Sequence, residues 1–214
     1  MLVYPNAIMR VMDKRVLYLI EQAGMMLDMP RAHVRNLGNN TPDTIASHCY
    51  HVAVIAYCLA RMEGLSNEDG LKAMGMGLLH DLAEARTGDA DFVAKNYTRM
   101  DDEKAVHDQF AGLPFGQDLE GMVHEYEERE TLVSKCAKDA DTLAQMYIEW
   151  LLAWRGHKLA EKWFEGDFTN RVPHMRTESA KKLAHAMKDS HPQEWWWSEF
   201  VDKGINYKHL NGHK

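Results

Sequence analysis

Apolar residues recur at steps of three and four along most of the chain, the spacing of one face of an α-helix. The pattern predicts an amphipathic helix over roughly 11–28. Its recurring positions are Val16, Leu17, Ile20, Ala23, Met26 and Leu27. A polar stretch from Pro30 to Thr44 predicts a loop. No alternating pattern longer than a few residues follows anywhere, so we expect no β-sheet.

Capping side chains and glycines mark the next two helices. A second helix is predicted to begin after Asp43 or Thr44 and to end before Gly64. A third is predicted from about 66 to 86, with Gly88 as its stop. Further helices are then expected over the remaining chain, near 100–111, 117–128 and 130–154, and twice more around Pro173 and Pro192. The simplest account is one all-α domain over 1–214.

Composition narrows the class of protein. The 214 residues carry a net charge of −7, and no basic patch of any length offers a surface for a nucleic-acid polymer. No apolar run approaches the ~18 residues that a membrane span needs, and residues 1–10 contain no secretory apolar region. The three cysteines are odd in number and unpaired in pattern, which suits a reducing compartment. We therefore expect a cytoplasmic protein with a small-molecule partner.

Histidine and aspartate stand at adjacent positions, His80 and Asp81, late in the third helix. Adjacent helical side chains lie about 100° apart and can converge on one divalent ion. Glu84 follows on the same face, where a carboxylate can accept a proton from water. The alternative is a capped helix end with an exposed acidic face.

Two other segments offer the same kinds of side chain. His48 leads a buried stripe in the second helix, where a histidine is either a ligand or an ordinary core or capping residue. Asp139 and Asp141 lie in a helix with an apolar face, and carboxylates near a core are costly unless paired or bound to a cation. These two lie about 200° apart around the helix, so they cannot both face one ion. The apolar stripe does not choose between them.

Taken in order, these residues read His…His-Asp…Asp, with each element on its own helix. The chain thereby resembles the HD superfamily of metal-dependent phosphohydrolases, and most closely its small 5'-nucleotidase branch, over roughly 28–150. The segments that carry the resemblance are Asp43-Thr44-Ile45-Ala46-Ser47-His48, His80-Asp81-Leu82-Ala83-Glu84 with Thr87-Gly88-Asp89, His124-Glu125-Tyr126-Glu127, and Lys138-Asp139-Ala140-Asp141. The resemblance implies a single HD-type helical bundle with its metal-site core at about 28–150 and a C-terminal helical extension at about 155–214.

The same resemblance implies a role for each site residue. The implied ligands of one divalent transition metal ion (Mn, Fe, Co, Ni or Zn) are His48, His80, Asp81 and Asp141. Glu84 would activate the attacking water, and Asp89 would help to hold substrate or water. An arginine ahead of the first histidine would contact phosphate, and both Arg31 and Arg35 are candidates.

The function that follows is removal of phosphate from a nucleotide, most simply a nucleoside 5'-monophosphate. One alternative is hydrolysis of a nucleoside triphosphate or another phosphoanhydride at the same metal site, which more basic residues such as Lys95 and Arg99 would favour. Another alternative is a non-catalytic nucleotide sensor, although Glu84 argues against it. The family resemblance and the run Trp195-Trp196-Trp197 also suggest a homodimer.

Overall fold

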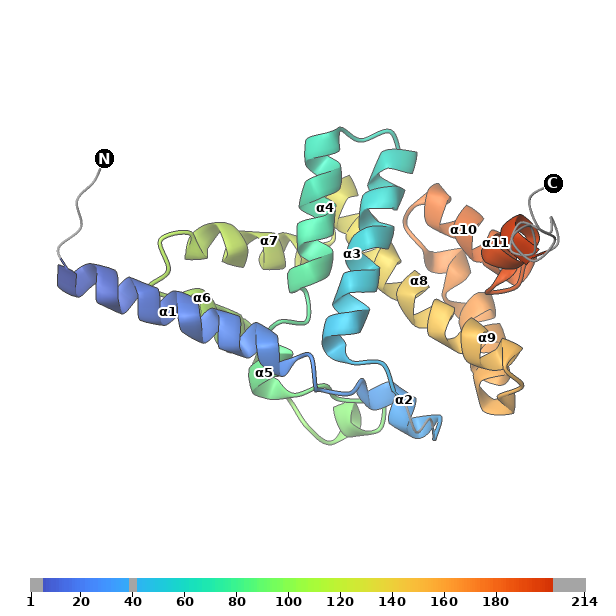
Figure 1. The fold of residues 1–214 in the computed structure, drawn as a ribbon, viewed down its shortest axis with the longest axis horizontal. Coiled ribbons are helices and arrows are strands. Elements are labelled where there is room, and N and C mark those ends of the chain that lie inside the picture. Colours follow the sequence, from blue (N-terminus) through green and yellow to red (C-terminus); the bar gives the residue numbers. More distant parts are fainter. Residues whose placement is uncertain (1–5, 39–41, 202–214) are drawn as a thin grey trace, which may run out of the picture. The chain divides into compact units, whose positions relative to one another are not determined.

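The computed structural model describes residues 6–38 and 42–201 (Figure 1). Within these ranges the chain is built from helices and turns without a strand, and one isolated bridge pairs Pro30 with Thr44. The predicted all-α class is confirmed. The helices are α1 (Asn6–Met25), α2 (Ala32–Asn36), α3 (Ile45–Met62), α4 (Asn67–Leu79), α5 (Glu84–Thr87), α6 (Asp102–Phe110), α7 (Gly116–Glu128), α8 (Leu132–Trp154), α9 (Lys158–Asn170), α10 (Glu178–Lys188) and α11 (Glu194–Trp196). Short turns of other helix types are η1 (Ala94–Asn96), η2 (Val172–His174) and η3 (Trp197–Val201).

The Cα positions divide the chain into two compact units, Met1–Ala144 and Gln145–Lys214. We refer to them as the N-terminal and C-terminal units. The division falls inside α8, slightly before the position expected for the C-terminal extension. All residues of the predicted metal site belong to the N-terminal unit.

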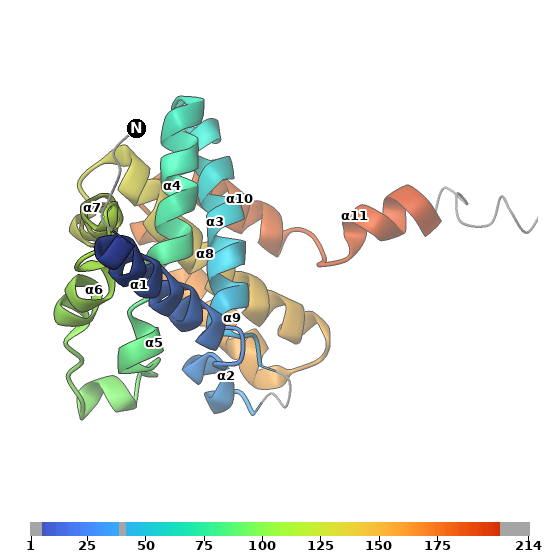
Figure 2. The ribbon, with the colours of Figure 1, turned by 60° about the vertical axis from the view of Figure 1, so that its left-hand side comes forward.

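The pair formed by α3 and α4 is the most closely packed part of the N-terminal unit (Figures 1 and 2). Thr44 caps α3 in a reciprocal capping box with Ser47, and Ser66 caps α4 in the same way with Asp69. A Cβ built on Gly77 would lie 2.8 Å from the backbone of Ala53. This glycine therefore lets the two helix backbones approach closely, which sets the position of the residues at the end of α4.

The predicted third helix is interrupted, which corrects one expectation. α4 ends at Leu79, residues 80–83 form turns, and α5 begins at Glu84. The Nδ1 of His80 hydrogen-bonds the Gly77 carbonyl oxygen at 2.9 Å, and the backbone continues through three-residue turns at Leu82 and Glu84. His80 and Asp81 thus stand at the end of a helix, where their side chains are not confined to one helical face.

The first helix begins earlier than predicted, at Asn6, and buries only part of its apolar stripe. Met26, just past its end, is buried, and Val16 and Leu19 pack on the core. Leu17 and Ile20 are 50% and 62% exposed. A second difference lies in the predicted loop 30–44, which contains the short helix α2.

One hydrophobic cluster of the N-terminal unit draws mainly on α3, the turn after α4, α6 and α7. Its buried members are Met26, Ile45, Cys49, Leu82, Ala83, Ala105, Val106, Phe110, Leu113 and Val123. Gly112, with φ of +78°, permits the sharp turn between α6 and α7. Of the three cysteines, Cys49 and Cys136 are buried and Cys58 is exposed.

The C-terminal unit contains the end of α8 together with α9, η2 and α10, and it continues through α11 into η3. Phe164, Val172, Ala180 and Ala184 are buried in it, and so is the carboxyl group of Glu149. Trp195 and Trp197 are 69% and 47% exposed. In the described part of the chain, no helix combines the length and apolar character that a membrane crossing requires.

Candidate metal centre

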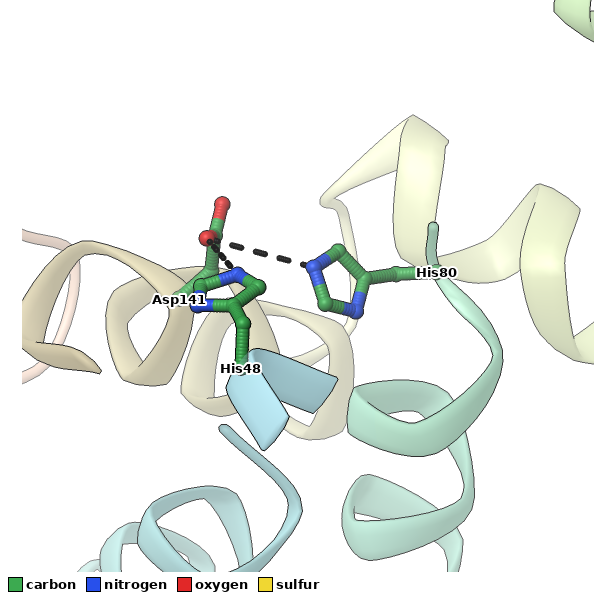
Figure 3. Close-up of side chains that lie close together, drawn as sticks. All are labelled: His48, His80 and Asp141. Atoms are coloured by element: carbon green, nitrogen blue, oxygen red, sulfur yellow. Dashed lines mark hydrogen bonds and ion pairs between the residues drawn. The ribbon is translucent and has the colours of Figure 1, made fainter. Parts of the chain in front are cut away.

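Two imidazoles converge on one carboxylate oxygen in the N-terminal unit. His48 lies in the first turn of α3, His80 directly follows the last residue of α4, and Asp141 lies on α8. The Nε2 atoms of His48 and His80 lie 3.1 Å and 3.9 Å from Oδ1 of Asp141. Figure 3 shows both rings directed at this oxygen, while the other oxygen of Asp141 points away from them. Three helices that are distant in sequence therefore meet at a cluster of potential ligand atoms.

Asp81 adds a second carboxylate to the cluster. Its Oδ2 lies 3.2 Å from Nε2 of His80 and 3.7 Å from Nε2 of His48. The same oxygen accepts a hydrogen bond from Nη1 of Arg31 at 2.9 Å. The four side chains that the sequence singled out, His48, His80, Asp81 and Asp141, are thus all brought together.

The donor set suits a divalent transition metal. The Gly77 carbonyl can only accept a hydrogen bond, so Nδ1 of His80 must be the donor. In the neutral form of the ring, which a bound cation would favour, Nε2 presents a lone pair. That Nε2 atom is buried, makes no hydrogen bond of standard geometry, and lies 3.2 Å from Oδ2 of Asp81. Ligand atoms of His48, His80 and Asp141 all lie within 4.8 Å of one another. Mixed imidazole and carboxylate ligands are the combination that ions such as Mn, Fe, Co, Ni and Zn accept.

Two basic side chains, Lys138 and Arg31, help to keep the carboxylates of the cluster ionised. Burial raises the pKa of Asp141, but Lys138 and the histidines outweigh this effect and hold it well below its usual range. Burial likewise acts against ionisation of Asp81, and His80 and Arg31 reverse the effect and lower its pKa. Burial lowers the pKa of His80, yet the two carboxylates raise it well above its usual value overall.

The outer oxygen of Asp141 is held by two side chains. Nζ of Lys138, three residues earlier on α8, lies 2.8 Å from Oδ2 of Asp141. The hydroxyl of Tyr126 donates to the same oxygen at 3.2 Å. The Tyr126 ring also packs against the His80 ring with centroids 5.1 Å apart. The sequence pattern placed Tyr126 and Lys138 within motifs without giving either of them a task.

Glu84 begins α5 beside the cluster. Its Oε2 is buried without a hydrogen-bond partner. Burial, followed by the charges of Asp81 and Asp89, raises the pKa of Glu84 to about 9. Asp89 accepts a hydrogen bond from the backbone N–H of Ala32 at 2.7 Å, and so ties the chain next to Arg31 to the segment after α5.

The predicted basic residues lie in different places. Arg31 is buried against Asp81, and its Nε has no hydrogen-bond partner. Arg35 is exposed and pairs with Asp91 at 2.6 Å. Lys95 is exposed on η1. Of the three, the structure brings only Arg31 into the cluster by a direct contact.

An aromatic contact next to Arg31 was not anticipated. The rings of His33 and Phe92 stack with centroids 5.1 Å apart and planes inclined by 26°. Burial, followed by the charge of Arg31, lowers the pKa of His33 to about 4, so this ring is neutral near pH 7. The pairing joins α2 to the segment after Asp89, two parts of the chain that periodicity alone does not connect.

The chain is similar to proteins of known sequence and to proteins of known structure. The chain is 26% identical over 149 residues to the 5'-deoxynucleotidase HDDC2 of Dictyostelium discoideum, a match that covers 65% of this chain and 78% of the relative. A structural-genomics crystal structure matches with a TM-score of 0.70 at 26% identity, covering 86% of this chain and 99% of the other. A predicted metal-dependent phosphohydrolase from Magnetospirillum magnetotacticum MS-1 matches with a TM-score of 0.56 at 20% identity, over 83% of this chain and 94% of that one.

A family comparison covers a larger part of the chain. The family described as HD domain matches residues 23–184, which include α2 to α9 and all four side chains of the cluster. The order His48, His80-Asp81, Asp141 and the all-helical fold agree with that match. The chain belongs to the HD domain family.

Proposed function

We propose that this protein is a metal-dependent phosphohydrolase that removes phosphate from a nucleotide, with a nucleoside 5'-monophosphate as its substrate. The observation that carries the proposal is the convergence of His48, His80, Asp81 and Asp141, with Glu84 and Arg31 beside them. The relative from Dictyostelium, a 5'-deoxynucleotidase, supports the choice of substrate class.

The four converging side chains would hold one divalent ion. When bound, such an ion supplies a Lewis acid and lowers the pKa of water in its neighbourhood. The positions of both histidine Nε2 atoms support this assignment, because each lies beside a carboxylate oxygen and a cation bound there would satisfy imidazole and carboxylate together. The identity of the ion is part of what the experiment below determines.

Glu84 would take the proton from the attacking water. Its buried carboxyl group has one oxygen free of hydrogen bonds. The pKa of about 9 keeps it protonated near neutral pH in the absence of a cation. A positive charge nearby favours the ionised form, so loading of the cluster would convert Glu84 into a base.

Arg31 would hold the phosphate. Its guanidinium group already lies at the cluster, and one of its N–H donors remains unsatisfied there. A guanidinium group matches the geometry of phosphate oxygens and offsets charge that develops on them. Asp89 would support this arrangement through its bond to the backbone of Ala32.

The experiment is a screen of nucleoside 5'-mono- and triphosphates with Mn, Fe, Co, Ni and Zn, scored separately by phosphate and pyrophosphate release. We expect phosphate release from monophosphates. We expect Glu84→Gln to keep the ion and the fold but to lower turnover by roughly 10²–10⁴. Pyrophosphate release, or turnover restricted to triphosphates, would favour the phosphoanhydride reaction instead. Nucleotide binding with no turnover under any ion would indicate a sensor.

A further inference from the structure

The two oxygens of Asp141 lie in different surroundings. Oδ1 faces the Nε2 atoms of His48 and His80, whereas Oδ2 accepts hydrogen bonds from Lys138 and Tyr126. Both partners of Oδ2 are themselves fixed. Tyr126 is buried against the ring of His80, and the Lys138 ammonium group lies 3.4 Å from the Tyr126 hydroxyl and 5.5 Å from the centre of its ring. The carboxylate is thereby held in one orientation.

A lysine at this position has a cost. The cluster is proposed to bind a divalent cation, and a second positive charge within a few ångströms of a ligand repels that cation. Charge balance alone does not require the lysine, because Arg31 already pairs with Asp81 and a bound divalent cation would itself neutralise Asp141. Lys138 must therefore have another benefit, and its contacts indicate that it fixes the geometry of Asp141.

Resting on the proposed function, we infer that Lys138 and Tyr126 are positioning residues that restrict Asp141 to one coordinating oxygen. An aspartate can bind a metal through one oxygen or through both. With Oδ2 occupied by two donors, only Oδ1 is available to the ion. The coordination position that the second oxygen would fill stays available to substrate and water, as a catalytic site requires.

The inference predicts a dissociation between ion binding and turnover. In Lys138→Met, Oδ2 is released and a repelling charge is lost, so Co²⁺ should bind at least as tightly as in the wild type. Turnover should nevertheless fall by roughly 10–100-fold, the usual effect of losing a partner that orients a metal ligand. A lysine that served only the fold would lower ion affinity, turnover and thermal stability together.

Tyr126→Phe separates geometry from charge. It removes one hydrogen bond to Oδ2 and changes no charge, and the buried ring remains in place. We expect a smaller loss of turnover with unchanged Co²⁺ affinity. Lys135→Met is the matched control, because Lys135 lies three residues earlier on α8 and is not one of the two donors that hold Oδ2 of Asp141. That variant should behave like the wild type.

The measurements are Co²⁺ affinity by competition with a chromophoric chelator, visible absorption of the Co²⁺ protein without substrate, and turnover. Because a second oxygen ligand raises the coordination number, the visible bands of Lys138→Met should weaken. The inference is overturned if Lys138→Met and Tyr126→Phe keep the wild-type spectrum, or if Lys138→Met weakens Co²⁺ binding tenfold or more. The spectrum needs no substrate, so it tests this inference even if the proposed activity fails.

Discussion

Asp139 and Asp141 are separated by one residue of α8 and lie in different surroundings. Asp141 faces His48, whereas Asp139 is buried near Cys136. Asp139 is only 2% exposed, so it does not face solvent. Because an apolar stripe locates the core and not a ligand, the sequence pattern alone could not choose between the two residues. The family pattern chose Asp141, and the geometry agrees with that choice.

Replacing these two aspartates should separate ion binding from stability. We expect Asp141→Ala to lose the ion and the activity, because it removes the oxygen that faces both imidazoles. Asp139→Ala should retain the ion but lower the free energy of unfolding by about 1–3 kcal/mol, since Asp139 is buried and the groups that interact with it would lose their partner in the core. Elemental analysis and urea unfolding of both variants check this. Loss of the ion in the Asp139 variant alone would reverse the assignment.

The sequence makes Arg31 and Arg35 equal candidates for phosphate binding, but the structure places them in different environments. We expect Arg31→Met to lower kcat/KM by roughly 10²-fold or more, because it removes the only one of the two guanidinium groups that contacts the cluster. Arg35→Met should retain near wild-type kcat/KM, since Arg35 pairs with Asp91, which is not one of the proposed metal ligands. Steady-state kinetics on the nucleotide found in the screen is the measurement. Equal losses in both variants would mean that phosphate reaches both arginines.

The sequence predicted where helices begin and end better than where a helix is interrupted. Thr44 and Gly64 bound α3 as expected, because capping hydroxyls and positive-φ glycines act locally. The end of α4 at Leu79 was missed, since apolar residues continue beyond it at helical spacing. The turn allows the His80 ring to hydrogen-bond the Gly77 carbonyl. Apolar spacing along the chain gives no sign of this contact.

Gly77 should be sensitive to a single methyl group. In Gly77→Ala the new Cβ would lie 2.8 Å from the backbone of Ala53, which cannot move aside as a flexible side chain can. We expect a loss of about 1–3 kcal/mol in the free energy of unfolding, together with weaker ion binding because His80 lies three residues further on. Gly121→Ala on α7 is the control. Its Cβ would meet nothing within 4 Å, so helix propensity should make it neutral or stabilising. Urea unfolding that ranks Gly121→Ala as the more damaging change would contradict this account.

For the molecule as a whole, the all-α class and the family could be predicted from the sequence, because both rest on helical spacing and on short motifs. The division into two units could not, since it falls at Ala144 inside one continuous helix with no break in its pattern. The half-exposed stripe of α1 was not foreseen for a related reason. Periodicity shows that Leu17 and Ile20 are apolar, but it does not show what covers them.

Stability should depend on pH through the C-terminal unit. Burial, followed by the charge of Asp167, raises the pKa of Glu149 from 4.5 to about 8. The folded chain therefore favours the protonated form of this group. Its contribution to stability is complete below about pH 4.5 and is lost as the pH rises through about 8.

Glu149→Gln removes that titration. Relative to the wild type, we expect the variant to gain on the order of 1–3 kcal/mol in the free energy of unfolding between pH 5 and pH 8. Glu165→Gln is the control, because Glu165 lies at the surface, paired with Lys188, where an ion pair contributes little. Urea unfolding at both pH values measures this difference. An identical pH dependence in wild type and Glu149→Gln would show that Glu149 does not cause the loss of stability.

The oligomeric state is a further property of the whole molecule that can be tested. We expect a homodimer in solution, and the exposed rings of Trp195 and Trp197 offer apolar surface that association would bury. Light scattering at micromolar concentration measures it, with the double variant Trp195→Ser, Trp197→Ser as a comparison. A monomer mass for the wild type would refute the dimer, and an unchanged dimer in the double variant would move its interface elsewhere.

The spacing of the cluster along the chain has a consequence during biosynthesis. His48 and Asp141 are 93 residues apart, so the last donor leaves the ribosome well after the first. At ordinary translation speeds of about 5–20 residues per second, that interval is roughly 5–20 s. Throughout it, the nascent chain lacks Asp141, so the set of proposed ligands is incomplete and ion binding should be weak. Metal loading is therefore expected to follow synthesis of α8, and the ion should then act as a late stabiliser of the folded state.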